Sequence, residues 1–357
     1  MAPPAFDRAG ALRVRVGPLA LKNPVVCASG EHVMTEAGIR AALGAGAAVV
    51  VAKSINESAA ARRQLAQTDY LRAGAGWQPL PWRGSGGSIL CRSGLQPRDS
   101  ADWIAAVAAL DREARAHDAY VAASVILADL DAAVSLAREI EAAGIRLLEF
   151  NVGTPYGDEA AHGGVTTERA AEKVGAQVAA IRRAVGIPVW VKLTGQSENV
   201  AALAAAARDG GATAVTMIGR MLGMLPDLDT MAPALDTNLG YGGDWALPLT
   251  CYWLARSRKR LGADAPLIGT NGARSGADVA RMLLAGASAV ELCSAVLTGG
   301  FGVLGAAVDE LADYLERKRC RAPDLVGRAA DRVLPYAELP ARAEHWRAFV
   351  PAETLGD

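Results

Sequence analysis

Short apolar runs alternate with longer helical patterns along most of the chain, and eight such pairs occur between Pro24 and Lys318. Each short run is apolar at successive positions, as expected of a strand that is covered on both faces. The expected strands are residues 25–28, 48–52, 120–126, 147–151, 189–193, 214–218, 267–269 and 289–292. This alternation predicts a sheet of parallel strands.

The segments between these strands carry helix signals at both ends. Residues able to cap a helix, Asp, Asn or Thr, open several of them. The expected helices include residues 129–143, 167–185, 199–209, 245–260 and 276–285. Four strands follow a small-residue turn in which glycine can take the left-handed C-cap conformation, at residues 44–47, 142–144, 210–212 and 285–287. We therefore predict an α/β fold, a single closed (β/α)8 TIM barrel, with a doubly wound open sheet as the alternative.

Two long segments interrupt this repeat and a third follows it. Residues 55–100, rich in Gly, Pro, Arg and Trp, come after the second strand, and residues 219–244 come after the sixth. Both leave strand ends at which barrel catalysis occurs, so we interpret them as lid or pocket-wall insertions; surface excursions or subunit contacts are the alternative. The C-terminal extension, residues 321–357, is expected to wrap around the barrel or to contact another subunit. One domain, residues 1–357 with a core at about 20–318, is expected.

Composition excludes several classes of protein. The chain has 357 residues, 51% of them hydrophobic and 21% charged, with a net charge of -1. No basic block is available to bind nucleic acid or a membrane surface. The most apolar run, residues 41–52, is shorter than the roughly 20 residues of a membrane span, and the N-terminus lacks the pattern of a secretory signal. Lacking both a span and a signal, the chain is expected to be cytoplasmic. The five cysteines form no CxxC pair, which argues against a disulfide scaffold, a bound metal or an iron–sulfur cluster.

Two lysines lie at strand ends inside apolar runs. Lys53 follows the second strand and Lys192 ends the fifth. A buried ammonium group is costly without an anionic partner, so each lysine is expected to face an anion at the barrel mouth. Two roles remain open, a Schiff-base nucleophile or a counter-charge to a cofactor that gains electrons. A side chain that extends outward to solvent is the third alternative.

Small residues follow the last two strands, as GTNG at residues 269–272 and as Cys293-Ser294. Backbone N–H groups at such positions can approach a phosphate closely, and the helix that follows adds partial positive charge. These segments predict a phosphate site, unless the glycine-rich turn only connects a strand to a helix.

Together these motifs resemble the dihydroorotate dehydrogenase family, and most closely the flavin barrel of dihydropyrimidine dehydrogenase. They occur in the family's order over roughly residues 20–300: NPVVCASG at 23–30, VAKS at 51–54, NVGTP at 151–155, VKLT at 191–194, GYGG at 240–243, GTNG at 269–272, GAS at 286–288 and CSAV at 293–296. The resemblance implies a bound FMN, a homodimer and hydride transfer to or from a small molecule. Without a cysteine cluster or a dinucleotide-binding motif, the electron donor or acceptor is expected to be a separate protein or a diffusible molecule.

The resemblance also implies which positions contact the flavin. It places Lys192 at the pyrimidine edge of the ring, where a fixed cation offsets the charge that arrives with a hydride. The implied cofactor-binding residues are Ala28, Ser29, Gly30, Lys53, Ser54, Asn151, Lys192, Gly242, Gly243, Gly269, Thr270, Asn271, Gly272, Cys293 and Ser294.

This chain departs from the family at the acid–base position. Where relatives carry a cysteine or serine after the fourth strand, Thr154 stands here. A threonine hydroxyl is a poor base at neutral pH, so either a relay exists or another group takes the proton, and His162 and Tyr156 are the nearest candidates in sequence. His162 is alternatively an exposed loop residue. The expected catalytic residues are Thr154, Lys192 and His162.

The asparagines with which relatives contact a pyrimidine are largely replaced. Cys91 stands before Gly94, Tyr156 follows Thr154-Pro155, and Arg220 lies after the sixth strand, where it can meet a substrate carboxylate or remain at the surface. Amide pairs recognise the alternating donors and acceptors of a pyrimidine ring, so their loss makes orotate or uracil a doubtful substrate. The expected substrate contacts are Lys53, Cys91, Gly94, Asn151, Tyr156 and Arg220.

The main hypothesis is therefore an FMN-dependent oxidoreductase that forms or reduces a C=C bond in a small cyclic or conjugated substrate. A class I aldolase-like lyase with Lys192 as Schiff base is one alternative. A flavoprotein without turnover is the other.

Overall fold

Eight parallel strands close into a barrel in the computed structural model, which describes residues 6–153 and 168–355. The strands are β3 (Val25–Cys27), β4 (Val49–Val51), β7 (Tyr120–Ile126), β8 (Leu148–Asn151), β9 (Val189–Lys192), β10 (Ala214–Met217), β13 (Leu267–Thr270) and β14 (Ala289–Leu292). The last strand, β14, pairs in parallel with the first, β3, so that Val290 lies opposite Val25. The predicted (β/α)8 barrel is confirmed, and the open sheet is excluded by this closure.

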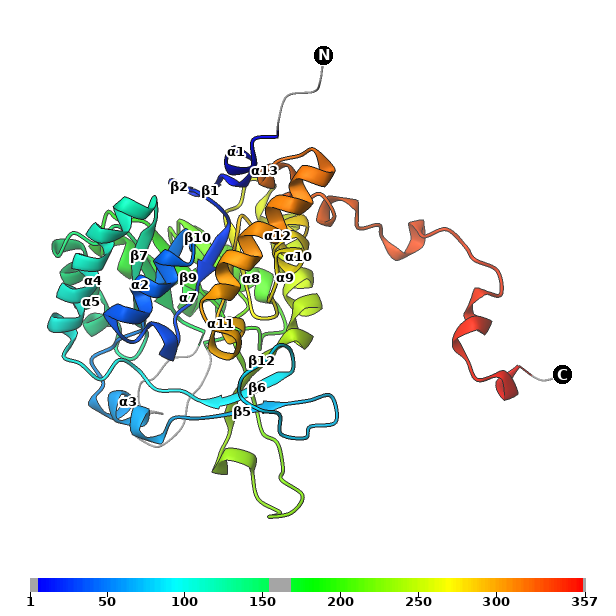
Figure 1. Cartoon of the computed structure of the whole chain (residues 1–357), viewed down its shortest axis with the longest axis horizontal. Helices are drawn as coiled ribbons and strands as arrows, with labels where there is room; N and C mark the ends of the chain where they lie inside the picture. The colour runs from blue at the N-terminus through cyan, green and yellow to red at the C-terminus, as the bar shows by residue number, and fades with distance from the viewer. Residues whose placement is uncertain (1–5, 154–167, 356–357) are drawn as a thin grey trace.

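Helices surround the barrel in Figure 1. They are α2 (Glu36–Gly44), α4 (Ser100–Ala114), α5 (Leu130–Ala142), α7 (Ala171–Ala184), α8 (Val200–Asp209), α9 (Leu247–Leu261), α10 (Gly276–Leu284) and α12 (Gly302–Lys318). The side chains of Thr35, Asp129 and Asn199 cap three of them by accepting a backbone N–H from the first turn. Within the described part of the chain, no helix has both the length and the hydropathy that a bilayer crossing requires.

The glycine turns that precede four strands behave as predicted. Gly46, Gly144, Gly211 and Gly286 have φ values of +96°, +83°, +98° and +117°. Residues with a Cβ rarely adopt this conformation, so glycine lets each helix end abruptly and the chain turn into the next strand.

The two insertions form one sheet across the mouth of the barrel. Residues 55–100 provide β5 (Asp69–Ala73) and β6 (Ser88–Arg92), and residues 219–244 provide β11 (Met221–Gly223) and β12 (Leu239–Gly243). They pair in the order β11-β12-β6-β5, and Gly240 of β12 lies opposite Cys91 of β6. Figure 1 shows this sheet beyond one end of the barrel.

The opposite end of the barrel is covered by the N-terminal segment, which no pattern in the sequence indicated. It contains α1 (Arg8–Leu12) and a hairpin of β1 (Val14–Val16) and β2 (Leu19–Leu21). Val16 and Leu21 of this hairpin are fully buried. One end of the barrel is thus closed by apolar packing, and the other is left for a site.

The C-terminal extension packs only at its start. Ala322 and Leu325 of α13 (Ala322–Leu325) are buried, whereas Tyr336, Trp346 and Phe349 are exposed. Figure 1 shows the chain running away from the barrel beyond α13. This part does not wrap around the barrel, contrary to one expectation, and its contact with another subunit stays a prediction.

Candidate active site

A cavity of about 1120 Å³, measured with its open mouth, lies between the carboxyl ends of the barrel strands and the sheet of the insertions. Most of the residues expected at a site line it: Ala28, Ser29, Gly30, Lys53, Ser54, Cys91, Gly94, Asn151, Lys192, Arg220, Gly242, Gly243, Thr270, Asn271, Gly272, Cys293 and Ser294. Gly269 does not line the cavity and packs against Met282 instead. Thr154, Tyr156 and His162 lie outside the described residues.

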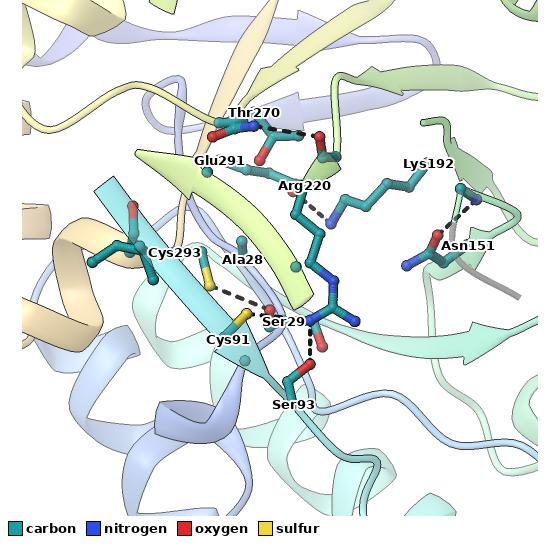
Figure 2. Close-up of a pocket in the computed structure, with 18 of the residues that line it drawn as sticks. Ala28, Ser29, Cys91, Ser93, Asn151, Lys192, Arg220, Thr270, Glu291 and Cys293 are labelled. Carbon is teal, nitrogen blue, oxygen red and sulfur yellow. Dashed lines mark hydrogen bonds and ion pairs between the residues drawn. The ribbon is translucent and has the colours of Figure 1, made fainter. Parts of the chain in front are cut away.

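Lys192 lies between two buried carboxylates at the floor of this cavity. Its Nζ is 2.8 Å from Oε2 of Glu149 on β8 and 2.7 Å from Oε2 of Glu291 on β14. Figure 2 shows the lysine directed toward Glu291. The side chains of both glutamates are 0% exposed. The sequence predicted that Lys192 needs an anion but did not identify it, although each glutamate is the one acidic residue of an apolar strand.

One ammonium group beside two ionised carboxylates would leave a net negative charge in a buried place, which is costly. Burial raises the pKa of Glu291 to about 8, an effect that Lys192 opposes and Glu149 reinforces. Burial disfavours the charged form of Lys192, but the two carboxylates outweigh burial and raise the pKa of the lysine above its ordinary value. Near neutral pH the lysine is therefore charged, and Glu291 largely keeps its proton.

A chain of hydroxyl groups connects this cluster to the segment that follows β3. The Oγ atoms of Ser29 and Ser54 are 3.1 Å apart, and those of Ser54 and Ser124 are 2.8 Å apart. Ser124 donates to Oε1 of Glu149 at 3.1 Å. Ser29 and Ser54 were expected at the site, whereas Ser124, inside strand β7, was not.

The second lysine also has an acidic partner. Nζ of Lys53 is 3.0 Å from Oε1 of Glu31, and the hydroxyl of Tyr70 donates to the other oxygen of Glu31. The main chain near Lys53 is fixed by Trp103, whose indole N–H donates to the Lys53 carbonyl at 2.9 Å. Glu31 and Tyr70 line the cavity but were missed, because neither belongs to a motif that the sequence made visible.

The sheet of the insertions brings a different set of side chains to the cavity. Arg220 donates to the hydroxyl of Ser93 and, at 3.5 Å, to Sγ of Cys91. Figure 2 shows Arg220 extending across the cavity toward these two residues. On the barrel side, Oδ1 of Asn151 accepts the backbone N–H of Gly153 at 2.9 Å, so the amide oxygen is engaged by its own loop.

The turn after β13 packs closely against β12 of the inserted sheet. A Cβ on Gly242 would lie 2.8 Å from Oδ1 of Asn271, which already accepts the backbone N–H of Gly243. Thr250 holds the turn by donating to the carbonyl of Thr270 at 3.1 Å and to that of Asn271 at 2.8 Å. The small residues Gly242, Gly243 and Gly272 line the cavity here, and such residues let a phosphate group approach the backbone closely.

Taken with the buried cation of Lys192, this wall fits flavin mononucleotide, which needs a phosphate cradle at one end and a charge partner for the ring at the other. Burial raises the pKa of Cys293 to about 12, so its thiol stays protonated. This cysteine therefore lines the cavity as a small neutral group.

Gly272→Ala is expected to destabilise the protein by about 2 kcal/mol or more and to weaken FMN binding. The residue has a φ of +110°, and a Cβ there would lie 2.4 Å from the backbone nitrogen of Leu247. Urea unfolding and fluorescence titration with FMN measure the two effects. Gly44→Ala is the matched control, because no atom lies within 4 Å of its added Cβ. Equal stability of the two variants would contradict the prediction.

Comparisons of the sequence with known proteins identify a family. The sequence model described as dihydroorotate dehydrogenase matches residues 11–315. The catalytic subunit of dihydroorotate dehydrogenase B (NAD(+)) from Methanocella arvoryzae is 28% identical over 319 residues, which cover 88% of this chain and 96% of that protein.

Two further relatives match over shorter stretches. Dihydroorotate dehydrogenase A (fumarate) from Limosilactobacillus reuteri is 36% identical over 157 residues, which cover 43% of this chain and 49% of the relative. Its counterpart from Lactiplantibacillus plantarum is 36% identical over 180 residues, 50% of this chain and 57% of the relative. These matches span about half the length of those relatives. The family match covers nearly the whole barrel, and the chain therefore belongs to the dihydroorotate dehydrogenase family.

Proposed function

We propose that the protein is an FMN-dependent oxidoreductase acting on a CH–CH bond of a small cyclic or conjugated substrate. The observation that carries this proposal is the charged Lys192 at the floor of a cavity whose rim is made of glycine and small polar residues. When bound, FMN exchanges a hydride with a substrate carbon. The chain's own contribution is to hold the cofactor, to supply a fixed cation and to shield the reaction from water.

The division of roles follows the two walls of the cavity. Gly242, Gly243, Gly272 and Ser294 would hold the ribityl phosphate by close backbone approach, and Ala28 to Gly30 would lie along the ring. Lys192 would stabilise negative charge that develops on the ring. Its two carboxylate partners fix the ammonium group in place, so little reorganisation is needed during reduction.

We propose that the substrate differs from dihydroorotate, the substrate named for the relatives. The wall formed by the insertions presents Cys91, Ser93 and Arg220, which are a thiol, a hydroxyl and a cation. A thiol and a hydroxyl cannot replace the paired donor and acceptor of an amide, so pyrimidine recognition would lose partners. Arg220 favours a substrate that carries an anionic group near this wall.

The lyase alternative is disfavoured by the state of Lys192. A Schiff base forms through the neutral amine, whereas two carboxylates raise the pKa of this lysine and keep it protonated. The other alternative, a flavoprotein without turnover, is distinguished from an oxidoreductase by the substrate experiment described next. Three further expectations stay predictions: a homodimer, a cytoplasmic location and a separate electron partner. The names of the relatives give fumarate or NAD(+) as such a partner.

The test is to purify the protein with FMN and to mix it anaerobically with L-dihydroorotate, 5,6-dihydrouracil and cyclic saturated carboxylates. Loss of the flavin absorbance near 450 nm identifies a substrate. The photoreduced protein is mixed in parallel with orotate, uracil and conjugated enoates. A colourless protein that cannot be reconstituted with FMN would overturn the proposal, and a yellow protein that exchanges electrons with none of these compounds would support the flavoprotein without turnover.

A further inference from the structure

Three polar side chains from different elements meet on the cavity wall. They form a second group, which shares no ion pair with the Lys192 cluster. Glu31 follows β3, Lys53 follows β4, and Tyr70 comes from β5 of the first insertion. All three line the cavity. Among the cavity-lining carboxylates of the described residues, Glu149 and Glu291 are paired with Lys192, whereas Glu31 is paired with Lys53.

Within residues 6–153 and 168–355, the hydrogen bonds of this group leave one acceptor open, the phenol oxygen of Tyr70. Lys53 occupies Oε1 of Glu31 at 3.0 Å, and the Tyr70 hydroxyl donates to Oε2. Both carboxylate oxygens are therefore engaged, while the phenol oxygen of Tyr70 keeps its lone pairs. A proton that arrives in the cavity can bind to the phenol oxygen as the phenol proton moves to Glu31.

The position of Tyr70 is fixed by its strand and by a neighbouring ring. Tyr70 lies opposite Cys91 in the pairing of β5 with β6, and Cys91 also lines the cavity. The indole of Trp82 lies 5.2 Å from the Tyr70 ring, centroid to centroid. The side chain is thus held by the same sheet that walls the site.

The charges around the pair keep it in the protonation states that a relay requires. Burial raises the pKa of Glu31, but Lys53, the Tyr70 hydrogen bond and Arg220 outweigh burial and lower it below the ordinary value. Burial, followed by Glu31, Cys91 and Cys293, raises the pKa of Tyr70. A protonated phenol therefore donates to an ionised carboxylate at neutral pH.

We infer that Tyr70 and Glu31 form the proton relay for the substrate, an inference that rests on the proposed function. During substrate oxidation a hydride leaves one carbon for the flavin, and the C–H bond of the adjacent carbon breaks. The electron pair of that bond forms the C=C bond, its proton binds to the Tyr70 oxygen, and the proton of Tyr70 passes to Glu31. Lys53 acts as a positioning residue that keeps Glu31 ionised before the reaction. The relay supplies the base that a threonine at position 154 supplies poorly.

The first experiment compares Tyr70→Phe and Glu31→Gln with the wild type, using the compound from the panel that reduces the flavin fastest. Each variant is expected to slow the anaerobic loss of 450 nm absorbance by about 10²–10³-fold. FMN content is expected to stay unchanged, because neither variant removes a group assigned to binding the flavin. Tyr252→Phe, at an exposed tyrosine of α9, is the matched control and is expected to keep the wild-type rate.

A second readout needs no substrate. The ionisation of Tyr70 is followed by the 295 nm absorbance of the wild type minus that of Tyr70→Phe as the pH is raised. We expect this phenol to ionise at a higher pH than an ordinary tyrosine, and Glu31→Gln to lower that pH. A phenol that ionises normally in both proteins would show that Tyr70 does not donate to an ionised Glu31, and would overturn the inference.

The outcomes separate the inference from the proposed function. If no compound of the panel exchanges electrons with the wild-type flavoprotein, the proposed function fails and the inference fails with it. If the wild type is reduced but Tyr70→Phe and Glu31→Gln are reduced at the same rate, only the inference fails. If Thr154→Val slows flavin reduction and Tyr70→Phe does not, the proton transfer belongs to Thr154, and again only the inference fails.

Discussion

Replacing Lys192 with methionine is expected to destabilise the protein by about 3–5 kcal/mol. It is also expected to lower the midpoint potential of the bound flavin, so that the flavin is no longer reduced at the potential that reduces it in the wild type. The lysine is the cation between Glu149 and Glu291, which are both fully buried. Without it, the negative charge that this buried cluster holds would have no partner. Urea unfolding measures the first effect, and the midpoint potential of the bound flavin measures the second.

Two comparisons make this prediction specific to charge. Lys53→Met removes a similar side chain, but its partner Glu31 is 19% exposed and also accepts from Tyr70, so the loss of stability is expected to be smaller. Combining Lys192→Met with Glu149→Gln and Glu291→Gln removes the unpaired charges and is expected to restore part of the stability. If Lys192→Met were as stable as Lys53→Met, Lys192 would not be the cation that stabilises the buried Glu149 and Glu291.

Glu291→Gln is expected to change how stability depends on pH. In the unfolded chain a glutamate loses its proton near the ordinary value of 4.5, whereas burial raises the pKa of Glu291 in the folded protein to about 8. Between these values the folded state holds a proton that the unfolded state has lost, so this group lowers the free energy of unfolding as the pH rises. The slope amounts to about 1.4 kcal/mol for each pH unit in this window, and it is absent from the variant.

The measurement is urea unfolding of both proteins at intervals from pH 5 to pH 8.5. The stability of Glu291→Gln relative to the wild type should increase through this window and level off above it. The midpoint potential of the bound flavin provides a second check, because ionised Glu291 opposes reduction. The potential of the variant should equal that of the wild type at low pH and should be higher than that of the wild type above pH 8. A constant difference in stability at every pH would show that Glu291 does not titrate in this range.

The barrel itself was determined by local sequence. Each predicted strand agrees with the structure within one or two residues, as 48–52 does with Val49–Val51, because a strand covered on both faces must be apolar at every position. The helix ends were equally visible, since Gly46, Gly144 and Gly286 supply a backbone conformation that few other residues adopt. The placement of Lys192 at a strand end also predicted a buried anion, because burial of an unpaired charge is too costly.

Only the tertiary structure decided which groups meet at the barrel mouth. Strand β6 pairs with β12, although Cys91 and its partner Gly240 are far apart in the sequence, and no local pattern records such a pairing. The same holds for Lys192 with Glu291, which meet only when the barrel closes, and for Glu31 with Tyr70, which meet only when the inserted sheet covers the barrel mouth. Periodicity specifies the elements because it reflects the burial of each one, whereas charges and hydroxyl groups find their partners through the closure of the barrel and the register of the inserted sheet.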